Sequence, residues 1–396
     1  MASAPPGDPP VRGGPASSPE RRVTSRPGLL ERAVQEQLAL TAWCPPPPPD
    51  GPDSLAVTFT GRLLQARDTD EDSSSPATGT SFALTATFER TGRSEPVAVT
   101  LRVTDVTPGE WVVAAQVEDP SPGRRSDRRG GRTRGSFITP VPVTGWRLRR
   151  HPVASRLECR VTTRLPPLAV AARVIPGLWL LTAVAGTALG LSVQQILVAG
   201  LRPHPSATLS VSLIALAAAV MGAKGWYLFL HRSRRSVQGW AVQGFIGGFV
   251  VAAVVVAAVR GVPLGAYFDT AAAGLFAGLA VGRLGCVFAG CCSGRPTSSR
   301  WGLWSSNQTV GTRRVPTQLL ESALAAVVAA GSALAVNFAG AREGWVLVAA
   351  VGAYTALRQP IVTQRDEPRQ SKLGPWAVGV SAAAVTFAGV MVAVVG

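Results

Sequence analysis

The chain has 396 residues and a formal net charge of +16, from 39 lysine and arginine residues against 23 aspartate and glutamate residues. Such a charge is typical of nucleic-acid-binding proteins. From Val174 onward, however, 16 basic and five acidic residues occur, and most of the basic ones lie between long apolar blocks. That pattern is typical of segments that flank a membrane, and it argues against a nucleic-acid partner.

The first region, residues 1–50, is rich in proline and ends in WCPPPPPD. Consecutive prolines form a stiff, extended spacer, so we expect a disordered tail here. Within it, the apolar residues between Gly28 and Trp43 predict one short amphipathic helix. The first thirty residues contain no apolar core of secretory type, and we therefore expect no cleaved signal peptide.

The second region, residues 51–165, consists of short runs in which apolar residues alternate with polar ones. Alternation between glycine- and proline-rich turns predicts a small β-sandwich-like soluble domain without a catalytic pattern, which suits a binding or spacer module. The predicted strands are 55–64, 81–90, 97–106, 110–119, 145–150 and 157–165. The arginine-rich segment 121–135 is expected to be disordered, either as a solvated loop or in contact with anionic lipid headgroups.

The third region, residues 174–396, carries seven apolar blocks close to the roughly 20 residues that cross a bilayer as a helix. Because hydrocarbon offers the backbone no hydrogen-bond partner, each block should be a helix. We therefore predict an all-α membrane domain, a seven-transmembrane-helix bundle. The predicted helices are Val174–Gly200, Ala207–Leu230, Trp240–Val259, Tyr267–Gly290, Gln318–Ala339, Gly344–Leu357 and Pro375–Val395.

One arginine, Arg283, lies well inside the fourth apolar block. Since arginine at mid-membrane depth costs roughly 2.5–3.5 kcal/mol on insertion scales, Arg283 should face a polar cavity or a bound anion. With seven crossings, the connections after the second, fourth and sixth helices share one membrane face, where most polar residues gather. We predict a cavity there that is lined by Arg283, Arg295, Arg358, Gln243, Gln318 and Glu321.

The predicted cavity suits an anion, because arginine presents a planar fork of donors that matches phosphate. Gly285 and Gly294 would let the backbone approach a headgroup. The alternative is that Arg283 and Glu321 form only a structural ion pair. The neighbouring Cys286, Cys291 and Cys292 lack a nearby histidine and zinc-type spacing, so we expect no metal and no cofactor; they are buried thiols or, alternatively, a redox pair.

Residues 282–290 and 294–297 resemble the signature of prolipoprotein diacylglyceryl transferase, GRxGNFxNGxxxGxPT. Further segments resemble other elements of this family in the same order. They are residues 222–224, 243–248 and 314–321, and the pair Arg358 and Arg365. The resemblance covers about residues 174–396 and leaves the N-terminal β domain unrecognised.

The resemblance implies a multi-pass protein of the bacterial plasma membrane that moves the diacylglyceryl group of phosphatidylglycerol to the lipobox cysteine of a prolipoprotein. It implies that Arg283 and Arg358 hold the lipid phosphate, and that Gln243 occupies the position of a histidine implicated in catalysis. The substrate-binding residues that it implies are Gly285, Cys286, Gly294, Arg295, Gln318 and Glu321.

The chain also departs from the family pattern. Cys286 and Ala289 replace asparagines, Val315 replaces a histidine and Val362 replaces a glutamate, besides Gln243. An amide cannot take a proton from a thiol. Two other functions therefore remain open, a catalytically silent lipid or lipoprotein binder and a thiol-redox membrane protein.

The orientation in the membrane has two opposing indications. Basic residues concentrate on the face that carries the motifs, so the positive-inside rule places this face and the N-terminal domain in the cytoplasm. The family resemblance implies an outward N-terminus.

Overall fold

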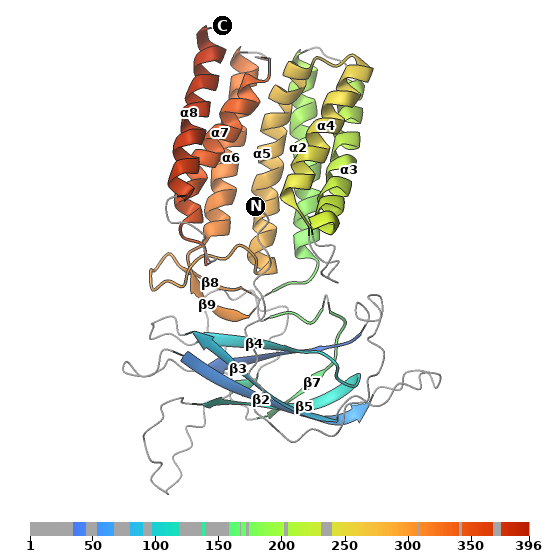
Figure 1. Ribbon diagram of the computed structural model, residues 1–396, viewed down its shortest axis with the longest axis vertical. Helices are drawn as coiled ribbons and strands as arrows, with labels where there is room; N and C mark the ends of the chain where they lie inside the picture. Colours follow the sequence, from blue (N-terminus) through green and yellow to red (C-terminus); the bar gives the residue numbers. More distant parts are fainter. Residues whose placement is uncertain are drawn as a thin grey trace, which may run out of the picture. The chain divides into compact units, whose positions relative to one another are not determined.

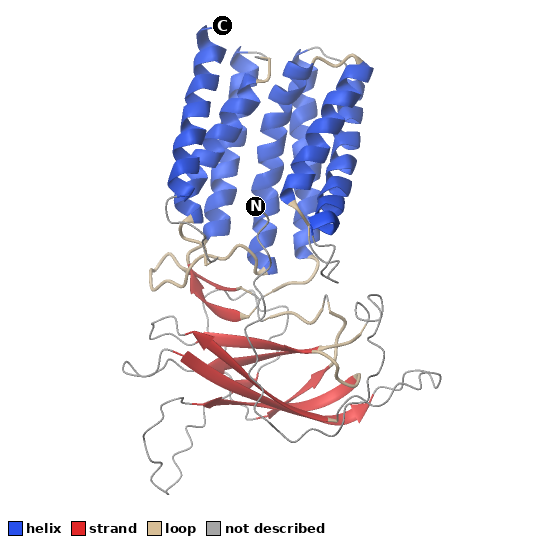
Figure 2. Cartoon of the chain, viewed as in Figure 1, coloured by secondary structure: helices blue, strands red, loops and turns tan. Residues whose placement is uncertain are grey.

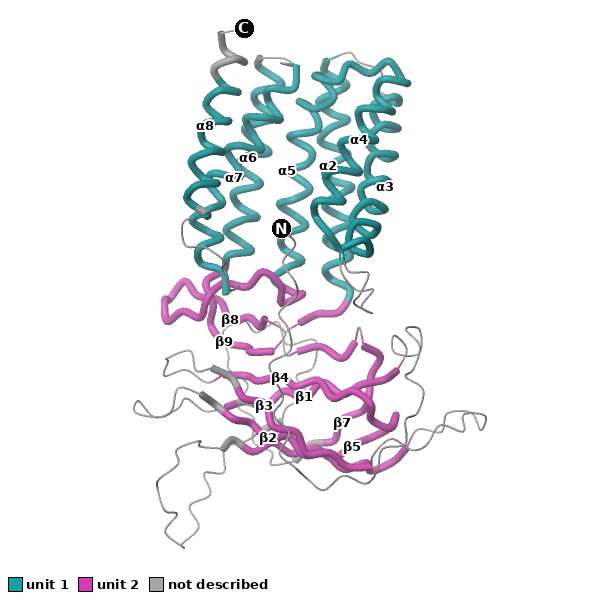
Figure 3. Tube along the Cα trace, in the orientation of Figure 1, with its two compact units in different colours: residues 1–5, 177–287, 317–396 teal, residues 6–176, 288–316 magenta. Residues whose placement is uncertain are grey.

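The structure is a computed structural model. In it, the chain forms two compact units (Figure 3). The helical unit comprises residues 1–5, 177–287 and 317–396, and the β unit comprises residues 6–176 and 288–316. The described residues are 35–44, 54–66, 80–89, 97–118, 137–138, 158–166, 168–171, 174–201, 205–230, 240–307, 309–339, 343–366 and 374–395.

Within its described residues, the β unit has two antiparallel sheets (Figures 1 and 2). The five-stranded sheet has the order β6-β1-β4-β9-β8, and the four-stranded sheet has the order β3-β2-β5-β7. The strands of the first are β1 (Leu38–Cys44), β4 (Val97–Val103), β6 (Phe137–Ile138), β8 (Leu303–Ser306) and β9 (Val310–Arg314). Those of the second are β2 (Ser54–Ala66), β3 (Ser81–Glu89), β5 (Gly109–Glu118) and β7 (Glu158–Thr162).

Alternating residues of both sheets share one apolar core. Leu40 and Val99 come from the five-stranded sheet, and Phe59 and Trp111 come from the four-stranded sheet; all four are fully buried. The indole of Trp111 donates a hydrogen bond to the carbonyl of Thr107 at 3.0 Å, which satisfies its one polar atom. The predicted β-sandwich-like domain is confirmed.

The predicted helix over residues 28–43 is wrong from Leu38 onward, because Leu38–Cys44 is strand β1. Leu38, Leu40 and Ala42 are fully buried at every second position, and β1 pairs along its whole length with β4. Burial at every second residue is the pattern of a strand, although the leucines of this segment also fit a helical period. Residues 1–34, the loop 121–135 and the predicted strand 145–150 lie outside the described residues.

In the part of the chain that the structure describes, the helical unit contains seven helices, α2 to α8. Their bounds are α2 Leu178–Leu201, α3 Pro205–Leu230, α4 Val242–Arg260, α5 Leu264–Ala289, α6 Thr317–Ala339, α7 Trp345–Val362 and α8 Gly374–Val395. Six of them, α2 to α7, are long and apolar enough to cross a membrane, and α8 contains a shorter apolar segment, Trp376–Val390. The predicted seven-helix membrane domain is confirmed, and α7 continues through Pro360 where we expected it to end at Leu357.

Small residues allow α2 and α5 to pack closely. A Cβ atom added to Gly186 would lie 2.5 Å from the carbonyl oxygen of Gly278, and one added to Gly190 would lie 2.6 Å from that of Gly274. Glycines four residues apart on both helices therefore face each other, the arrangement that favours helix association in lipid. This contact brings α5, the helix of Arg283, directly against α2.

A buried carboxylate connects α5 to the start of α7. Asp269 accepts hydrogen bonds from the backbone N–H groups of Gly344 at 3.1 Å and Val346 at 2.9 Å. The first N–H groups of a helix have no partner within the helix and carry partial positive charge. Asp269 thus satisfies the α7 terminus and anchors α7 against α5.

Candidate anion-binding site

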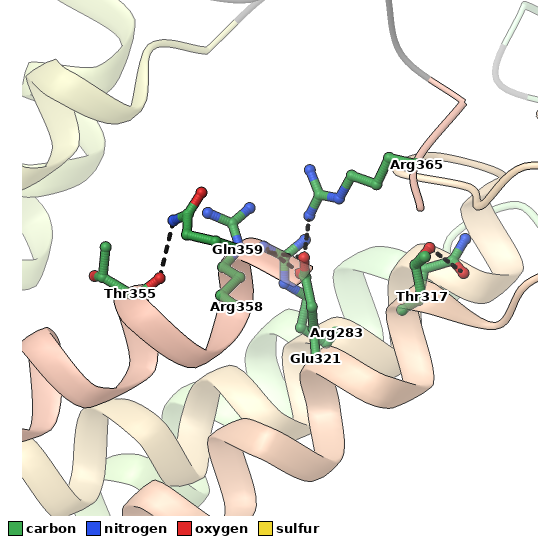
Figure 4. A network of polar contacts seen from close by, with 8 residues as sticks. Arg283, Thr317, Glu321, Thr355, Arg358, Gln359 and Arg365 are labelled. Atoms are coloured by element: carbon green, nitrogen blue, oxygen red, sulfur yellow. Dashed lines mark hydrogen bonds and ion pairs between the residues drawn. The ribbon is translucent and has the colours of Figure 1, made fainter. Parts of the chain in front are cut away.

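Glu321 is the centre of the candidate site. It lies one turn into α6, and its side chain is fully buried. Three arginine side chains from α5 and α7 and from the segment after α7 converge on its two oxygens (Figure 4). We call Glu321, Arg283, Arg358 and Arg365 the arginine cluster.

The distances in the cluster are those of direct ion pairs. Nη2 of Arg283 lies 2.9 Å from Oε2 of Glu321. Nε of Arg358 donates to Oε1 at 3.1 Å, and Nη2 of Arg365 donates to the same oxygen at 2.6 Å. Oε1 thus accepts hydrogen bonds from two guanidinium groups, and Oε2 forms an ion pair with the third.

The cluster carries more positive than negative charge. Three arginines surround one glutamate, which leaves two positive charges in excess. The Arg283 and Arg358 side chains keep 15% and 30% of their surface accessible, whereas that of Glu321 keeps 1%. Arg283 and Arg358 are therefore partly accessible to a ligand, whereas the carboxylate that they contact is not.

Tyr354 provides a neutral polar group beside the cluster. It lies on α7 one turn before Arg358, and its ring packs against Phe276 of α5 with centroids 5.2 Å apart. Its hydroxyl is buried and lies close to the charged groups of Arg283, Glu321 and Arg358. Buried hydroxyls in proteins bind another group, water or a ligand.

We expect Tyr354→Phe to weaken the binding of an anionic lipid about two- to tenfold, because one neutral hydrogen bond contributes about 0.5–1.5 kcal/mol. The ring contact with Phe276 remains, so the thermal stability should stay within about 1 °C to 2 °C of wild type. Lipid titration of the purified protein by intrinsic fluorescence measures the first, and a thermal melt measures the second. Equal affinities in both proteins would exclude the hydroxyl from the site.

The structure places the other predicted helical residues at the ends of the same helices. Gln318 is buried at the start of α6, one turn before Glu321. Gly285 and Cys286 are buried on α5, and Gly285 faces Thr182 of α2 so closely that a Cβ atom would overlap the threonine hydroxyl. Gly285 therefore serves helix packing in this structure.

Gln243 lies exposed in the first turn of α4. Within the described part of the chain, no hydrogen bond or ion pair is seen between Gln243 and the arginine cluster. Its assignment as a catalytic residue stays a prediction.

Gly294 and Arg295 belong to the β unit. Gly294 is buried and its carbonyl accepts a hydrogen bond from Nη1 of Arg314 at 3.0 Å, while Arg295 has an exposed side chain. A Cβ atom on Gly294 would overlap the backbone of Val315, which explains the need for glycine at this position. The roles of Gly294 and Arg295 in substrate binding stay predictions.

Two groups of the site were missed as site residues by the sequence analysis. Arg365 binds Glu321 directly. The sequence did contain a signal for it, because the spacing between Arg358 and Arg365 fits the late element of the family. Tyr354 gave no sequence signal, because tyrosine in an apolar helix is typical of core packing.

The fold and the cluster define a class of protein, a multi-pass membrane protein whose helical bundle holds a buried carboxylate and an excess of arginines. The family model described as prolipoprotein diacylglyceryl transferase matches residues 175–395, more than half of the chain. The chain therefore belongs to the prolipoprotein diacylglyceryl transferase family. No curated protein matches it.

Family membership makes this chain a transferase-like membrane protein of lipoprotein biosynthesis, which implies a lipid and a lipoprotein as substrates. The matched residues include the whole arginine cluster and the segment 288–316 of the β unit. The match begins after strands β1 to β7, so the N-terminal β domain lies outside it.

Proposed function

We propose that this protein transfers the diacylglyceryl group of phosphatidylglycerol to the lipobox cysteine of a prolipoprotein in a bacterial plasma membrane. The observation that carries the proposal is the arginine cluster, in which three guanidinium groups meet one buried carboxylate. Its two excess positive charges suit the single negative charge of a phosphodiester headgroup. Arginine also matches the geometry of phosphate oxygens.

In the proposed reaction, the thiol sulfur forms a thioether bond with a glyceryl carbon of the lipid. The bond between that carbon and the phosphate oxygen breaks, and the electron pair leaves with glycerol phosphate. The thiol proton passes to a base or to solvent, so that atoms and charge balance. Negative charge therefore grows on the leaving phosphate oxygens in the transition state.

The cluster supports this step by electrostatic stabilisation. Arg283 and Arg358 are partly accessible, whereas their partner Glu321 is buried and fixes their orientation. Donors that are already oriented toward developing charge lower the barrier without reorganising during the reaction. Removing one such donor typically costs about 100- to 1000-fold in rate.

The test is glycerol phosphate release by the purified protein in vesicles that contain phosphatidylglycerol and a lipobox peptide. We expect release only when lipid and peptide are both present, together with a diacylglyceryl mass increase on the peptide cysteine. A peptide with serine in place of that cysteine is the matched control. Release from wild-type protein that does not depend on the peptide thiol would contradict the transferase assignment.

A second candidate function, binding without turnover, is favoured by Gln243, whose amide cannot accept a thiol proton. It predicts saturable binding of phosphatidylglycerol without release of glycerol phosphate. The two candidates share the arginine cluster and differ only in the presence of product. The same assay therefore separates them.

Cysteine labelling can determine on which side of the membrane the β unit lies. Cys44 is buried, and burial raises its pKa to about 12, so it is a poor target for thiol reagents. Arg160 on β7 has a side chain that is 71% accessible. Labelling of an Arg160→Cys variant by an impermeant maleimide in intact cells would show an outward β unit, and labelling only after lysis would show a cytoplasmic one.

A further inference from the structure

The N-terminal β domain, strands β1 to β7, shares a sheet with the segment 288–316 of the family-matched region. Strand β4 pairs antiparallel with β9, with Ala98 opposite Gly311 and Val99 opposite Val310. The N–H of Thr100 donates to the carbonyl of Thr309 at 2.7 Å. A strand of one domain thus extends a hairpin that lies more than 200 residues later in the chain.

The pairing occupies one half of the β9 edge, and the family motif occupies the other half. Beyond Gly311, the N–H of Thr297 donates to the carbonyl of Arg313 at 2.9 Å, and the N–H of Val315 donates to that of Arg295 at 3.0 Å. Strand β4 and residues 295–297 therefore lie end to end along β9. Movement of β9 away from β4 would displace the motif residues with it.

Buried polar contacts make this segment one rigid piece. The guanidinium of Arg314 is fully buried and donates to the carbonyls of Gly294 at 3.0 Å and Val310 at 3.1 Å. Oδ1 of Asn307 accepts from the N–H of Val310 at 2.7 Å and closes the hairpin turn. These buried bonds connect the motif, the turn and β9 to one another.

Chain connectivity ties the same segment to the candidate site. It begins directly after Val287, four residues beyond Arg283 on α5, and ends at Pro316, five residues before Glu321 on α6. The two helices that supply this ion pair are therefore joined by the segment that β4 holds. The arginines that we assign to the lipid phosphate, Arg283 and Arg358, lie on α5 and α7 outside this segment, so we assign the segment to the second substrate, the peptide acceptor.

We infer that the N-terminal β domain is a positioning module for the prolipoprotein, which acts by pairing β4 with β9 and so holds the segment 288–316 for the extended acceptor peptide. This inference deepens the proposed function and rests on it for the identity of the acceptor. The lipid phosphate site should not depend on the pairing. No role in chemistry is assigned to the β domain itself.

The test compares two variants of the full-length protein in lipid nanodiscs. Thr100→Pro removes the N–H that binds Thr309. The control Thr41→Val/Thr100→Val keeps this N–H and replaces the mutual hydroxyl contact of 2.9 Å by two methyl groups. The readouts are affinity for a labelled lipobox peptide, affinity for phosphatidylglycerol, and hydrogen exchange of residues 303–316.

We expect Thr100→Pro to weaken peptide binding about tenfold, to raise exchange at residues 309–311 and to leave phosphatidylglycerol affinity within about twofold of wild type. The control should match wild type in all three readouts. Peptide affinity that stays at the wild-type value while exchange at residues 309–311 rises would overturn the inference. A wild-type protein that binds the peptide without releasing glycerol phosphate would contradict the transferase reaction and leave the positioning role standing.

Two further measurements test whether Thr100→Pro merely unfolds the β domain. Cys44 is buried in β1 opposite Val97 of β4, so its alkylation, followed by peptide mass spectrometry, reports on the intact sheet. If Thr100→Pro exposes Cys44, the comparison moves to Val310→Glu, which places a carboxylate opposite the buried Val99 from the β9 side. This variant should show the same selective loss of peptide affinity while Cys44 stays protected; unchanged affinity with raised exchange would again refute the role.

Discussion

Arg283→Ala is expected to lower glycerol phosphate release at least about 100-fold, because it removes a preoriented donor from the site of developing charge. The fold should survive, since Glu321 keeps Arg358 and Arg365 as partners. The excess charge of the cluster falls from two to one, so the affinity for phosphatidylglycerol should fall as well. Initial rates at several lipid concentrations, measured in nanodiscs, separate the effect on kcat from the effect on KM.

Two companion variants sharpen this result. Arg283→Lys keeps the charge but loses the planar fork, so its rate should lie between those of wild type and Arg283→Ala. Arg300→Ala removes an exposed arginine that stacks on Trp301 in the β unit, and it is expected to leave the rate unchanged. Turnover that survives Arg283→Ala, or falls equally in Arg300→Ala, would remove Arg283 from the phosphate site.

Glu321→Gln is expected to have the largest effect on stability. The carboxylate is fully buried between three guanidinium groups, and its neutralisation removes the negative charge that all three contact. Breaking a buried ion pair by removing one partner typically costs about 3–5 kcal/mol. A thermal melt in detergent should show a marked drop in Tm, with Glu343→Gln, an exposed residue, as the matched control.

The same variant also tests anion binding, because a cluster that has lost its one carboxylate attracts an anion more strongly than the wild-type cluster does. Added phosphatidylglycerol should therefore raise the Tm of Glu321→Gln by more than it raises that of wild type. The double variant Glu321→Gln/Arg365→Gln also removes one of the mutually repelling positive charges and should recover part of the lost stability. An unchanged Tm in Glu321→Gln would show that the cluster does not depend on its carboxylate.

A purely structural Arg283–Glu321 ion pair was the alternative to an anion site. The structure contains this pair at 2.9 Å, but as one contact among three that share the same carboxylate. A structural pair would need one arginine. The proposed phosphate ligand accounts for the additional arginines. The melts with added phosphatidylglycerol test this explanation, because they compare the rise in Tm between wild type and Glu321→Gln.

The helices were predictable because hydrocarbon allows only internally bonded backbone, so length and hydropathy suffice to locate them. The joint position of Arg283, Glu321 and Arg358 near one end of the bundle was also predictable, since seven crossings determine which connections share a face. The shared carboxylate and the role of Arg365 were not. They depend on side-chain directions at the ends of α6 and α7, which the apolar pattern does not contain.

In the β unit, less of the fold was predictable from the sequence. Alternation located β2, β3, β4, β5 and β7. Residues 38–43 were assigned to a helix, because the leucines there satisfy a helical period as well as a period of two. Strands β8 and β9 were missed within a short polar connection. Their pairing with β4 depends on register between distant segments, and local sequence does not specify it.

By itself the sequence determined the membrane bundle, the family and the residues that carry positive charge, because hydropathy, motif order and charge are local properties of the chain. Only the tertiary structure decided that three arginines share one buried carboxylate and that β4 extends the hairpin β8–β9. Both features are contacts between residues distant in the chain, and their geometry is determined by the packing of whole helices and strands.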